Sequence, residues 1–131
     1  MPRFFRATCK ISLFAAALLC GGFTANAATY YVSQSTGDDS LDGLAAAKAG
    51  ANGPWKTLAK ASTEYKPGDS ILLKKGDTWN EELTPKGSGT PEKPILISSY
   101  GQGNKPLIDR EDFKQDRTGI RLDNKSGYKI V

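Results

Sequence analysis

The chain has 131 residues, a formal net charge of +4 and no histidine. This length allows one domain, and the lack of histidine excludes from this stretch any catalytic triad with a histidine base and any histidine-ligated metal. Three positive charges and no acid lie in residues 1–27, which leaves +1 for the remainder and argues against a nucleic-acid binder.

Residues 1–27 have the pattern of a secretory signal peptide. A basic start that ends at Lys10 is followed by an apolar run over residues 11–23 and by the cleavage pattern Ala25-Asn26-Ala27. The apolar run of about 13 residues is shorter than the roughly 20 that span a bilayer, which disfavours a membrane anchor. We therefore predict cleavage near Ala27 and a secreted protein, extracellular or periplasmic, without membrane contact afterwards.

Both cysteines, Cys9 and Cys20, lie in this removable segment. A lipid anchor on Cys20 is disfavoured because Leu19 occupies the preceding position, where lipid attachment requires a small residue. The exported chain therefore has no thiol for a disulfide, a zinc site or a nucleophile.

Residues 28–69 are predicted to form an N-terminal strand and a capping helix. Residues 29–33 are β-branched and aromatic, which is typical of a strand. Pro54 is placed to begin a helix that runs through Tyr65 and ends before Pro67-Gly68, with Trp55 and other large side chains on one face. Such a segment would cover the first coil of a solenoid, whose core and strand edge are otherwise exposed.

Residues 70–131 repeat short β-type runs. Those at Ile71, Ile95 and Ile120 begin about two dozen positions apart, and a second series, Leu83, Leu107 and Val131, recurs at the same interval. Turn-forming residues separate the runs. The pattern predicts an all-β fold, the start of a right-handed parallel β-helix with an N-terminal α-helical cap and first coils that are incomplete. The alternative is an antiparallel sandwich, which also uses short strands.

Four motifs resemble the amino-terminal end of secreted right-handed parallel β-helix proteins: Tyr30-Tyr31-Val32-Ser33, the GDDSLDG stretch at 37–43, PWKTLAKA at 54–61 and PGDSILL at 67–73. That group includes pectate lyase-like, chondroitinase B-like and alginate lyase-like polysaccharide lyases. The resemblance implies lyase action on an anionic polysaccharide partner. It places the catalytic groups on central coils that this chain lacks, so no catalytic, cofactor-binding or metal-binding residue is assigned and the cofactor is unknown. The alternative is a non-enzymatic surface, adhesion or carbohydrate-binding β-helix protein.

The GDDSLDG stretch invites comparison with a calcium loop. An EF-hand loop that began at Asp38 would need an acid at its twelfth position, which is Ala49. We therefore interpret Asp38, Ser40 and Asp42 as parts of a turn in which side-chain oxygens accept hydrogen bonds from nearby amides.

Other polar and aromatic residues are weaker candidates. Paired carboxylates can divide acid and base roles, but the charged stretch Asp109, Arg110, Glu111, Asp112, Asp116, Arg117 and Arg121 is interpreted as a solvated loop. Glu81 and Glu82 are adjacent, so in a strand they would point to opposite faces. Trp79 and Tyr100 could stack on sugar rings, although packing is the commoner role. Asn124 could form a ladder at a coil corner.

Overall fold

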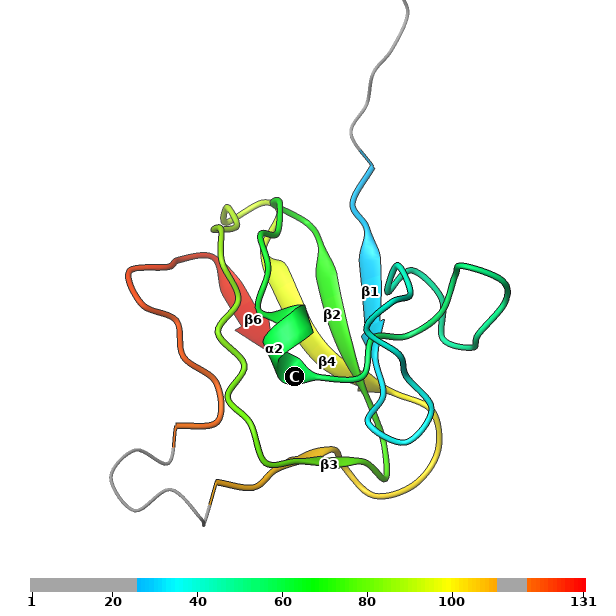
Figure 1. Cartoon of the computed structure of the whole chain (residues 1–131). Helices are drawn as coiled ribbons and strands as arrows, with labels where there is room; N and C mark the ends of the chain where they lie inside the picture. Colours follow the sequence, from blue (N-terminus) through cyan, green and yellow to red (C-terminus); the bar gives the residue numbers. More distant parts are fainter. Residues whose placement is uncertain (1–25, 111–117) are drawn as a thin grey trace, which may run out of the picture.

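The computed structural model describes residues 26–110 and 118–131, in which strands are the main regular secondary structure (Figure 1). The elements are β1 Thr29–Val32, α2 Leu58–Ala61, β2 Ser70–Lys74, β3 Thr78–Trp79, β4 Ile95–Tyr100, β5 Leu107–Ile108 and β6 Tyr128–Ile130. The prediction of an all-β protein is confirmed. No helix within the described ranges is long and apolar enough to cross a membrane. The predicted signal peptide lies outside these ranges except for its last two residues.

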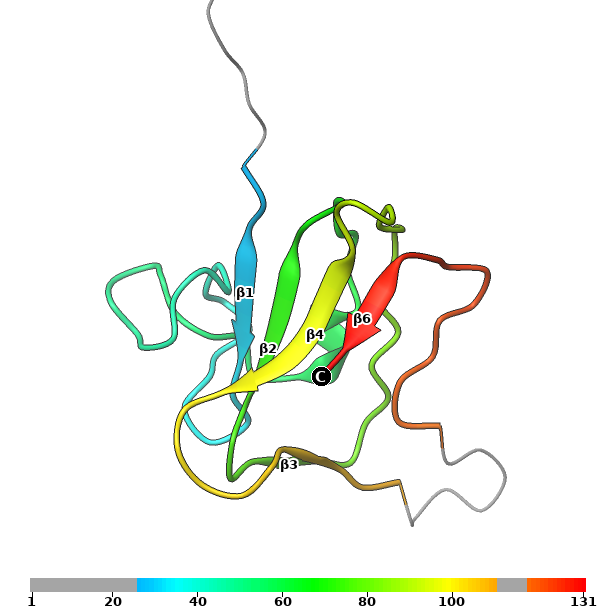
Figure 2. The same ribbon diagram turned by 180° about the vertical axis from the view of Figure 1, so that it is seen from behind.

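All the paired strands of the described part run parallel. β1, β2, β4 and β6 form a four-stranded sheet in that order (Figure 2), and β3 pairs with β5 in a second, two-stranded sheet. Neighbouring parallel strands must be joined by a crossover of a dozen residues or more, so the chain leaves the sheet after each strand and returns to the same end. These pairings exclude the antiparallel sandwich for the described strands.

The register corrects the predicted fixed period. Tyr30 pairs with Ile71, Ile71 with Ile97, and Ile97 with Ile130, so the three steps along the chain are unequal, with the first the longest and the second the shortest. The segment that joins two strands can vary in length as long as it brings the chain back to the same end of the sheet. Each doubling of the length of a loop costs only about 0.6 kcal/mol in closure entropy. A fixed period is therefore not required.

The third run of the predicted first series is also misplaced. Ile120 does not enter the four-stranded sheet but forms a parallel bridge with Leu83. Leu107 pairs with Thr78 instead of continuing the series from Leu83. The strand that follows β4 in the sheet is β6, whose only large aliphatic residue, Ile130, is 57% exposed, so the apolar pattern used to find strands is weak there.

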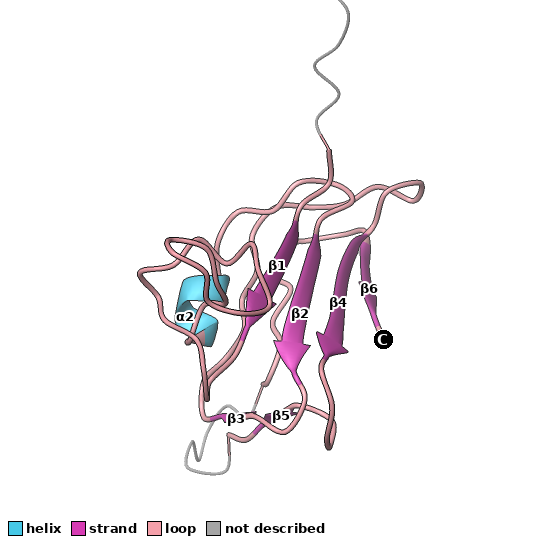
Figure 3. Cartoon of the chain, turned by 90° about the vertical axis from the view of Figure 1, so that its right-hand side faces the viewer, coloured by secondary structure: helices cyan, strands magenta, loops and turns pink. Residues whose placement is uncertain are grey.

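The core lies on one face of the four-stranded sheet. In β2 the buried residues are Ile71 and Leu73, and in β4 they are Ile95 and Ile97, which is the alternation expected of strands with one buried face. Helix α2 lies over this face. In the view of Figure 3, β3 and β5 lie beneath the lower end of the four-stranded sheet. The buried cluster comprises Val32, Trp55, Leu58, Ala61, Tyr65, Ile71, Leu73, Trp79, Leu83, Ile95 and Ile97.

The helix predicted from Pro54 to Tyr65 is only four residues long. Trp55 is extended instead, because its amide donates to the carbonyl of Tyr31 at 2.9 Å and its carbonyl accepts from the amide of Ser33 at 2.8 Å. Helix α2 begins after Thr57, whose hydroxyl accepts from the Lys60 amide at 3.0 Å. Hydrogen bonding of the backbone around Trp55 to β1 thus overrides the helical pattern of the side chains.

The segment between β1 and α2 covers the outer edge of β1. Besides the two bonds of Trp55, the amide of Tyr31 donates to the carbonyl of Gly43 at 2.7 Å. Gly43 has a φ of +78°, and a Cβ there would lie 2.5 Å from the Trp55 indole, so only glycine fits this close approach. One edge of the sheet is therefore closed by irregular structure.

Replacing Ile71, which is fully buried between Tyr30 and Ile97, by alanine leaves a cavity in the centre of the sheet. We expect Ile71→Ala to lower the free energy of unfolding by about 2–5 kcal/mol in urea titrations. Lys48→Ala, at an exposed position, is the control and should stay within about 0.5 kcal/mol of the wild type. A loss at Ile71 no larger than the control's would contradict this position of the core.

Candidate functional site

The carboxylates of the GDDSLDG stretch are engaged in local hydrogen bonds. Asp38 Oδ1 accepts from the amide of Ser40 at 2.9 Å and from its hydroxyl at 2.7 Å. Asp42 Oδ1 accepts from the amide of Leu44 at 2.9 Å, and its Oδ2 accepts from the side-chain amide of Asn52 at 2.5 Å. These bonds confirm that the stretch is a turn. In the described ranges, no three acidic or sulfur-bearing side chains gather as a metal site would require.

Asp39 connects this turn to the start of α2. Its Oδ1 accepts from the amides of Lys56 at 2.8 Å and Thr57 at 3.0 Å, and its Oδ2 accepts from the Thr57 hydroxyl at 2.7 Å. Partial burial raises the pKa of Asp39, but the hydrogen bonds from Thr57 and Lys56 lower it by more than burial raises it. The pKa of Asp39 therefore lies below its ordinary value. Asp39, the remaining acid of the GDDSLDG stretch, thus has a structural role, because its carboxylate accepts hydrogen bonds from the backbone at Lys56 and Thr57.

Glu81 and Glu82 have separate partners, as expected for adjacent residues. Glu81 Oε2 accepts from the amide of Leu58 at 2.6 Å, at the start of α2. Glu82 forms an ion pair with Arg121, with 3.0 Å between Oε1 and Nε, and accepts from the Thr84 hydroxyl at 2.9 Å. Two carboxylates held by different elements do not form an acid and base pair.

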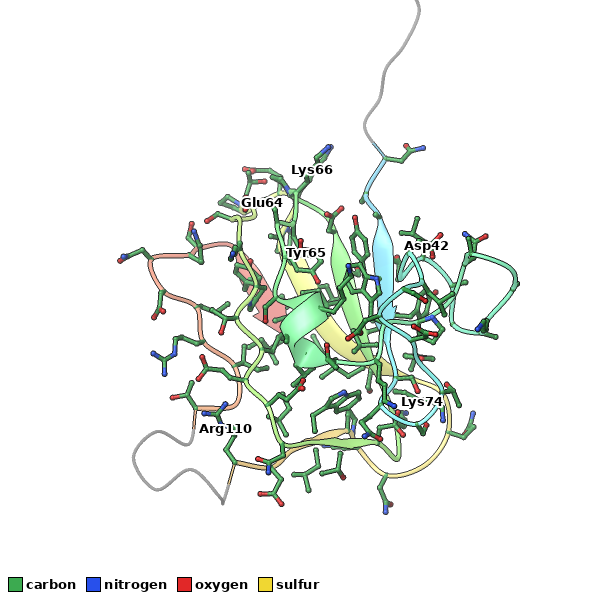
Figure 4. The ribbon with its side chains drawn as sticks, in the orientation of Figure 1. Asp42, Glu64, Tyr65, Lys66, Lys74 and Arg110 are labelled. Atoms are coloured by element: carbon green, nitrogen blue, oxygen red, sulfur yellow. The ribbon has the colours of Figure 1, made fainter. Side chains whose placement is uncertain are left out.

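The charged stretch near residue 110 is described only in part. Residues 111–117 lie outside the described ranges, so the interpretation of Glu111, Asp112, Asp116 and Arg117 as a solvated loop stays a prediction. Arg121 belongs to the ion pair with Glu82. Figure 4 shows Arg110 and Asp42 on opposite sides of the molecule, so the described start of this stretch lies away from the GDDSLDG turn.

Trp79 and Tyr100 differ in their surroundings. Trp79 is 2% exposed and its indole donates to the carbonyl of Lys56 at 2.9 Å, which confirms packing as its role. Tyr100 packs edge-on against Tyr31, with 5.0 Å between ring centroids. Burial and the charge of Asp77 raise the pKa of Tyr100 to about 12. Asn124 is exposed with a φ of +52°, as in a turn, and its predicted ladder stays a prediction.

A buried polar cluster at the end of β2 was not found by sequence reasoning. Asp77 is only 7% exposed, and its Oδ2 accepts from the hydroxyl of the fully buried Ser33 at 2.9 Å and from the amide of Ser35 at 3.2 Å. Lys74 donates to the Ser35 hydroxyl at 3.1 Å, and Figure 4 shows Lys74 beside the loop that follows β1. The sequence signal was a Gly-Asp pair, which indicates a corner but says nothing about burial.

A polar recess of about 260 Å³ lies between β3 and the start of α2. Its lining side chains are Gln34, Lys56, Thr57, Thr78, Trp79, Asn80 and Glu81. Glu81 is the only acid among them, and its carboxylate is already bonded to the amide of Leu58. The recess therefore offers hydrogen bonds of the kind that sugar hydroxyls accept and donate, but no pair of carboxylates for general acid and base catalysis.

The fold defines a class, an all-β protein built on parallel strands, and solved proteins with a similar structure are known. Two crystal structures of GH136 lacto-N-biosidase from Eubacterium ramulus superpose on this chain with a TM-score of 0.64. The selenomethionine derivative is 27% identical and the native protein 28% identical. The matches cover 79% and 78% of this chain, respectively, and 19% of the solved chain in both cases.

A curated relative has the same activity in its name. Lacto-N-biosidase from Bifidobacterium longum subsp. longum is 38% identical to this chain over 92 residues, which is 65% of this chain and 5% of the relative. No protein-family model matches the chain. The chain thus spans only a small part of the proteins it is similar to.

These relatives correct the resemblance drawn from the sequence. The similar proteins are glycoside hydrolases, so the assignment to pectate lyase-like or chondroitinase B-like polysaccharide lyases is wrong, and so is the inferred lyase action on an acidic polysaccharide. The motifs behind the assignment now have structural explanations: Asp39 and Gly43 hold the covered edge of β1, and residues 70–73 form β2. Residues that build an edge carry little information about the reaction, because one fold can support several chemistries.

Because the turn uses its carboxylates internally, we expect about 1 mM calcium, a level at which weak extracellular sites bind, to leave the midpoint of thermal unfolding unchanged. Asp42→Ala should lower that midpoint equally with and without calcium, since it removes the bonds to Leu44 and Asn52. A calcium-dependent rise of several degrees that disappears in Asp38→Ala and Asp42→Ala would overturn the turn interpretation.

The Asp77 cluster predicts a loss of stability in acid. Burial raises the pKa of Asp77, but the hydrogen bonds from Ser35 and Ser33 and the charge of Lys74 lower it by more than burial raises it. The pKa of Asp77 therefore lies below its ordinary value of 3.8. A carboxylate whose pKa is lower in the folded state than in the unfolded state stabilises the fold at pH values above its unfolded-state pKa. This stabilisation is lost as the pH falls through the folded-state pKa. We therefore expect the fall in unfolding free energy between pH 7 and pH 3 to be smaller in Asp77→Asn than in the wild type.

The matched control is Asp123→Asn, which removes an exposed carboxylate and should keep the wild-type difference between the two pH values. An undiminished pH dependence in Asp77→Asn, measured by urea unfolding, would show that Asp77 does not have the buried, hydrogen-bonded carboxylate described above.

Proposed function

We propose that the chain is the amino-terminal part of a secreted glycoside hydrolase that acts on an oligosaccharide carrying a lacto-N-biose unit. The observation that carries the proposal is the similarity to lacto-N-biosidases. The curated relative is 38% identical over the matched residues, and the similarity to the solved structure covers 79% of this chain. It supports a carbohydrate partner, without the anionic character expected from the sequence. Export rests on the signal-peptide pattern of residues 1–27.

The architecture proposed for the longer protein is a parallel β-helix. Two sets of parallel strands, β1-β2-β4-β6 and β3-β5, support a coil in which each turn contributes one strand to each sheet. Residues 28–69 are proposed as the cap, since the segment after β1 bonds to the outer edge of that strand through Gly43 and Trp55. Residues 70–131 would then be the first coils.

Within this protein the chain supplies scaffold and not chemistry. Hydrolysis of a glycosidic bond generally uses two carboxyl groups that flank the bond. Glu81, which lines the polar recess, and Asp39, which bonds to the lining residues Lys56 and Thr57, both accept from backbone amides at the start of α2. We therefore assign the catalytic carboxylates to coils that follow this part, and we assign to this part the closure of one end of the helix.

The test is hydrolysis by the full-length protein of an aryl lacto-N-bioside that releases a coloured phenol. We expect colour release by the full-length protein and none by residues 28–131 alone, because Glu81, the one acid that lines the described polar recess, is bonded to the amide of Leu58. The same phenol linked to a single sugar should be cleaved much more slowly, since the enzyme is proposed to recognise the disaccharide.

Alginate, pectate and chondroitin are the control substrates, from which no unsaturated product should form. Release of such a product, or no hydrolysis of the lacto-N-bioside by a folded full-length protein, would contradict the proposal. Sequencing the exported protein from its amino terminus tests the secretion step separately, with Ala28 expected as its first residue.

A further inference from the structure

A buried carboxylate lies at the start of the four-stranded sheet. Asp69, the residue before β2, is only 4% exposed. Its Oδ2 accepts from the amide of Lys66 at 2.8 Å, and the Lys66 carbonyl accepts from the Asp69 amide at 3.1 Å, as in a local turn. Its Oδ1 accepts from the amide of Ala28 at 2.9 Å, across 41 positions of the sequence. One oxygen thus serves the turn, and the other reaches the residue that precedes β1.

The nitrogen of Ala28 is held at this carboxylate by the sheet. The carbonyl of Ala28 accepts from the amide of Ser70 at 2.9 Å, next to the pairing of Thr29 with Ser70. Figure 1 shows the start of β1 beside the start of β2. Ala28 makes both contacts with its own backbone, so neither contact requires the residues that precede it.

The Asp69 carboxylate has no cationic partner in the described part of the chain. Within residues 26–110 and 118–131, no lysine or arginine nitrogen lies within 4.0 Å of it. Lys66 and Lys93, on the neighbouring turns, are exposed. The two amides satisfy the oxygens without neutralising the charge, and a buried charge is costly unless it is paired. A neutral serine or asparagine would serve the turn equally well, so the turn does not explain the charge.

Removal of the signal peptide would supply a cation at this place. The cleavage pattern ends at Ala27, and hydrolysis of the next peptide bond consumes one water. Ala27 then leaves as a carboxylate, while Ala28 keeps the nitrogen as an amine that takes up the proton. An α-amino group has an ordinary pKa of about 7.7–8.0, so it is mostly an ammonium ion at neutral pH. Ala27 is exposed and belongs to no strand, so its loss leaves the contacts of Ala28 intact.

We propose that Asp69 is the binding site for the amino terminus created by cleavage, where the α-ammonium group of Ala28 forms a partly buried ion pair that fastens β1 to β2. This inference rests on the export step of the proposed function. It gives cleavage a structural consequence, because the mature chain gains a charge pair that the precursor lacks. The pair requires the free nitrogen at Ala28 itself, since one residue of a strand advances about 3.3 Å.

The tyrosines near Asp69 stay neutral in the pH range where an amino terminus titrates. Burial and the charge of Asp69 raise the pKa of Tyr30 above its ordinary value of 10.0. Burial is also the main cause that raises the pKa of Tyr65, with smaller contributions from Tyr30, Tyr128 and Asp69. A titration at Ala28 between pH 7 and pH 9 therefore reports the α-amino group and not these phenols.

The experiment measures the reactivity of the amino terminus in the full-length exported protein. Trace acetylation by acetic anhydride modifies only the uncharged amine, so its rate against pH gives the pKa of the Ala28 α-amino group. Mass spectrometry of the amino-terminal peptide measures that rate. A nearby opposite charge favours the charged form. We expect a pKa of about 9 in the wild type, and a return to about 7.7–8.0 in Asp69→Asn.

Two further variants provide matched controls. Inserting one glycine between Ala27 and Ala28 keeps every side chain but moves the ammonium group away by one residue, so the new terminus should have an ordinary pKa. Asp123→Asn removes an exposed carboxylate and should keep the raised value.

The ion pair should also slow the local opening of β1. A group whose pKa is higher in the folded state stabilises the fold at pH values below its unfolded-state pKa. This stabilisation is lost as the pH rises through the folded-state pKa, so at pH 7 it is present. We expect amide hydrogen exchange in the peptide that covers β1 to be about fivefold faster at pH 7 in the glycine-insertion variant than in the wild type.

Several outcomes would overturn the proposal: an ordinary pKa at Ala28 in the wild type, a raised pKa that survives Asp69→Asn, equal exchange of β1 in the wild type and the insertion variant, or a first residue other than Ala28. If Asp69→Asn does not fold, the glycine insertion decides. None of these readouts depends on hydrolysis of a sugar, so failure here is distinguishable from failure of the proposed function.

Discussion

Parallel pairing between successive strands is the interaction on which the rest of the structure depends. It brings Tyr30, Ile71, Ile97 and Ile130 side by side on one face of the sheet, although they are far apart in the sequence. Because parallel strands cannot be joined by a tight turn, the chain must leave the sheet after each one and return to the same end. These excursions carry β3, β5 and α2 to the inner face, where Ile71 becomes fully buried. The core is therefore a consequence of how the chain returns.

The finish of the two sheet edges links this arrangement to function. At β1 the outer edge is bonded to an irregular segment, which Asp39 connects to the start of α2. At β6 no described strand pairs with the outer edge. The covered edge of β1 is consistent with the coil stack that we propose for the longer protein. The proposal of a longer protein agrees with the small share of the lacto-N-biosidases that the chain matches and with the structural role of Asp39 and Glu81.

The sequence predicted the kind of fold better than its details. The short β-type runs at Ile71 and Ile95, about two dozen residues apart, located β2 and β4. The same period placed Val131 in the second series, although the adjacent β6 joins the main sheet, and it misassigned Ile120, which pairs outside that sheet. The helical pattern after Pro54 failed because the backbone at Trp55 bonds to β1. Buried Asp77 could not be predicted, since its partners come from a loop that is distant in the sequence. The reaction class was wrong because residues that shape an edge do not identify a substrate.

The direction of strand pairing is the most direct test of this account, and nuclear Overhauser contacts between backbone protons of a labelled chain measure it. Parallel pairing of β2 with β4 places Ile71 opposite Ile97 and Lys74 opposite Tyr100, so contacts should connect both pairs in the same order along the two strands. An antiparallel arrangement would reverse the order and bring Lys74 close to Leu96, with short contacts between α-protons. That reversed pattern would contradict both the parallel sheet and the order of strands that places β1 and β6 at its two edges.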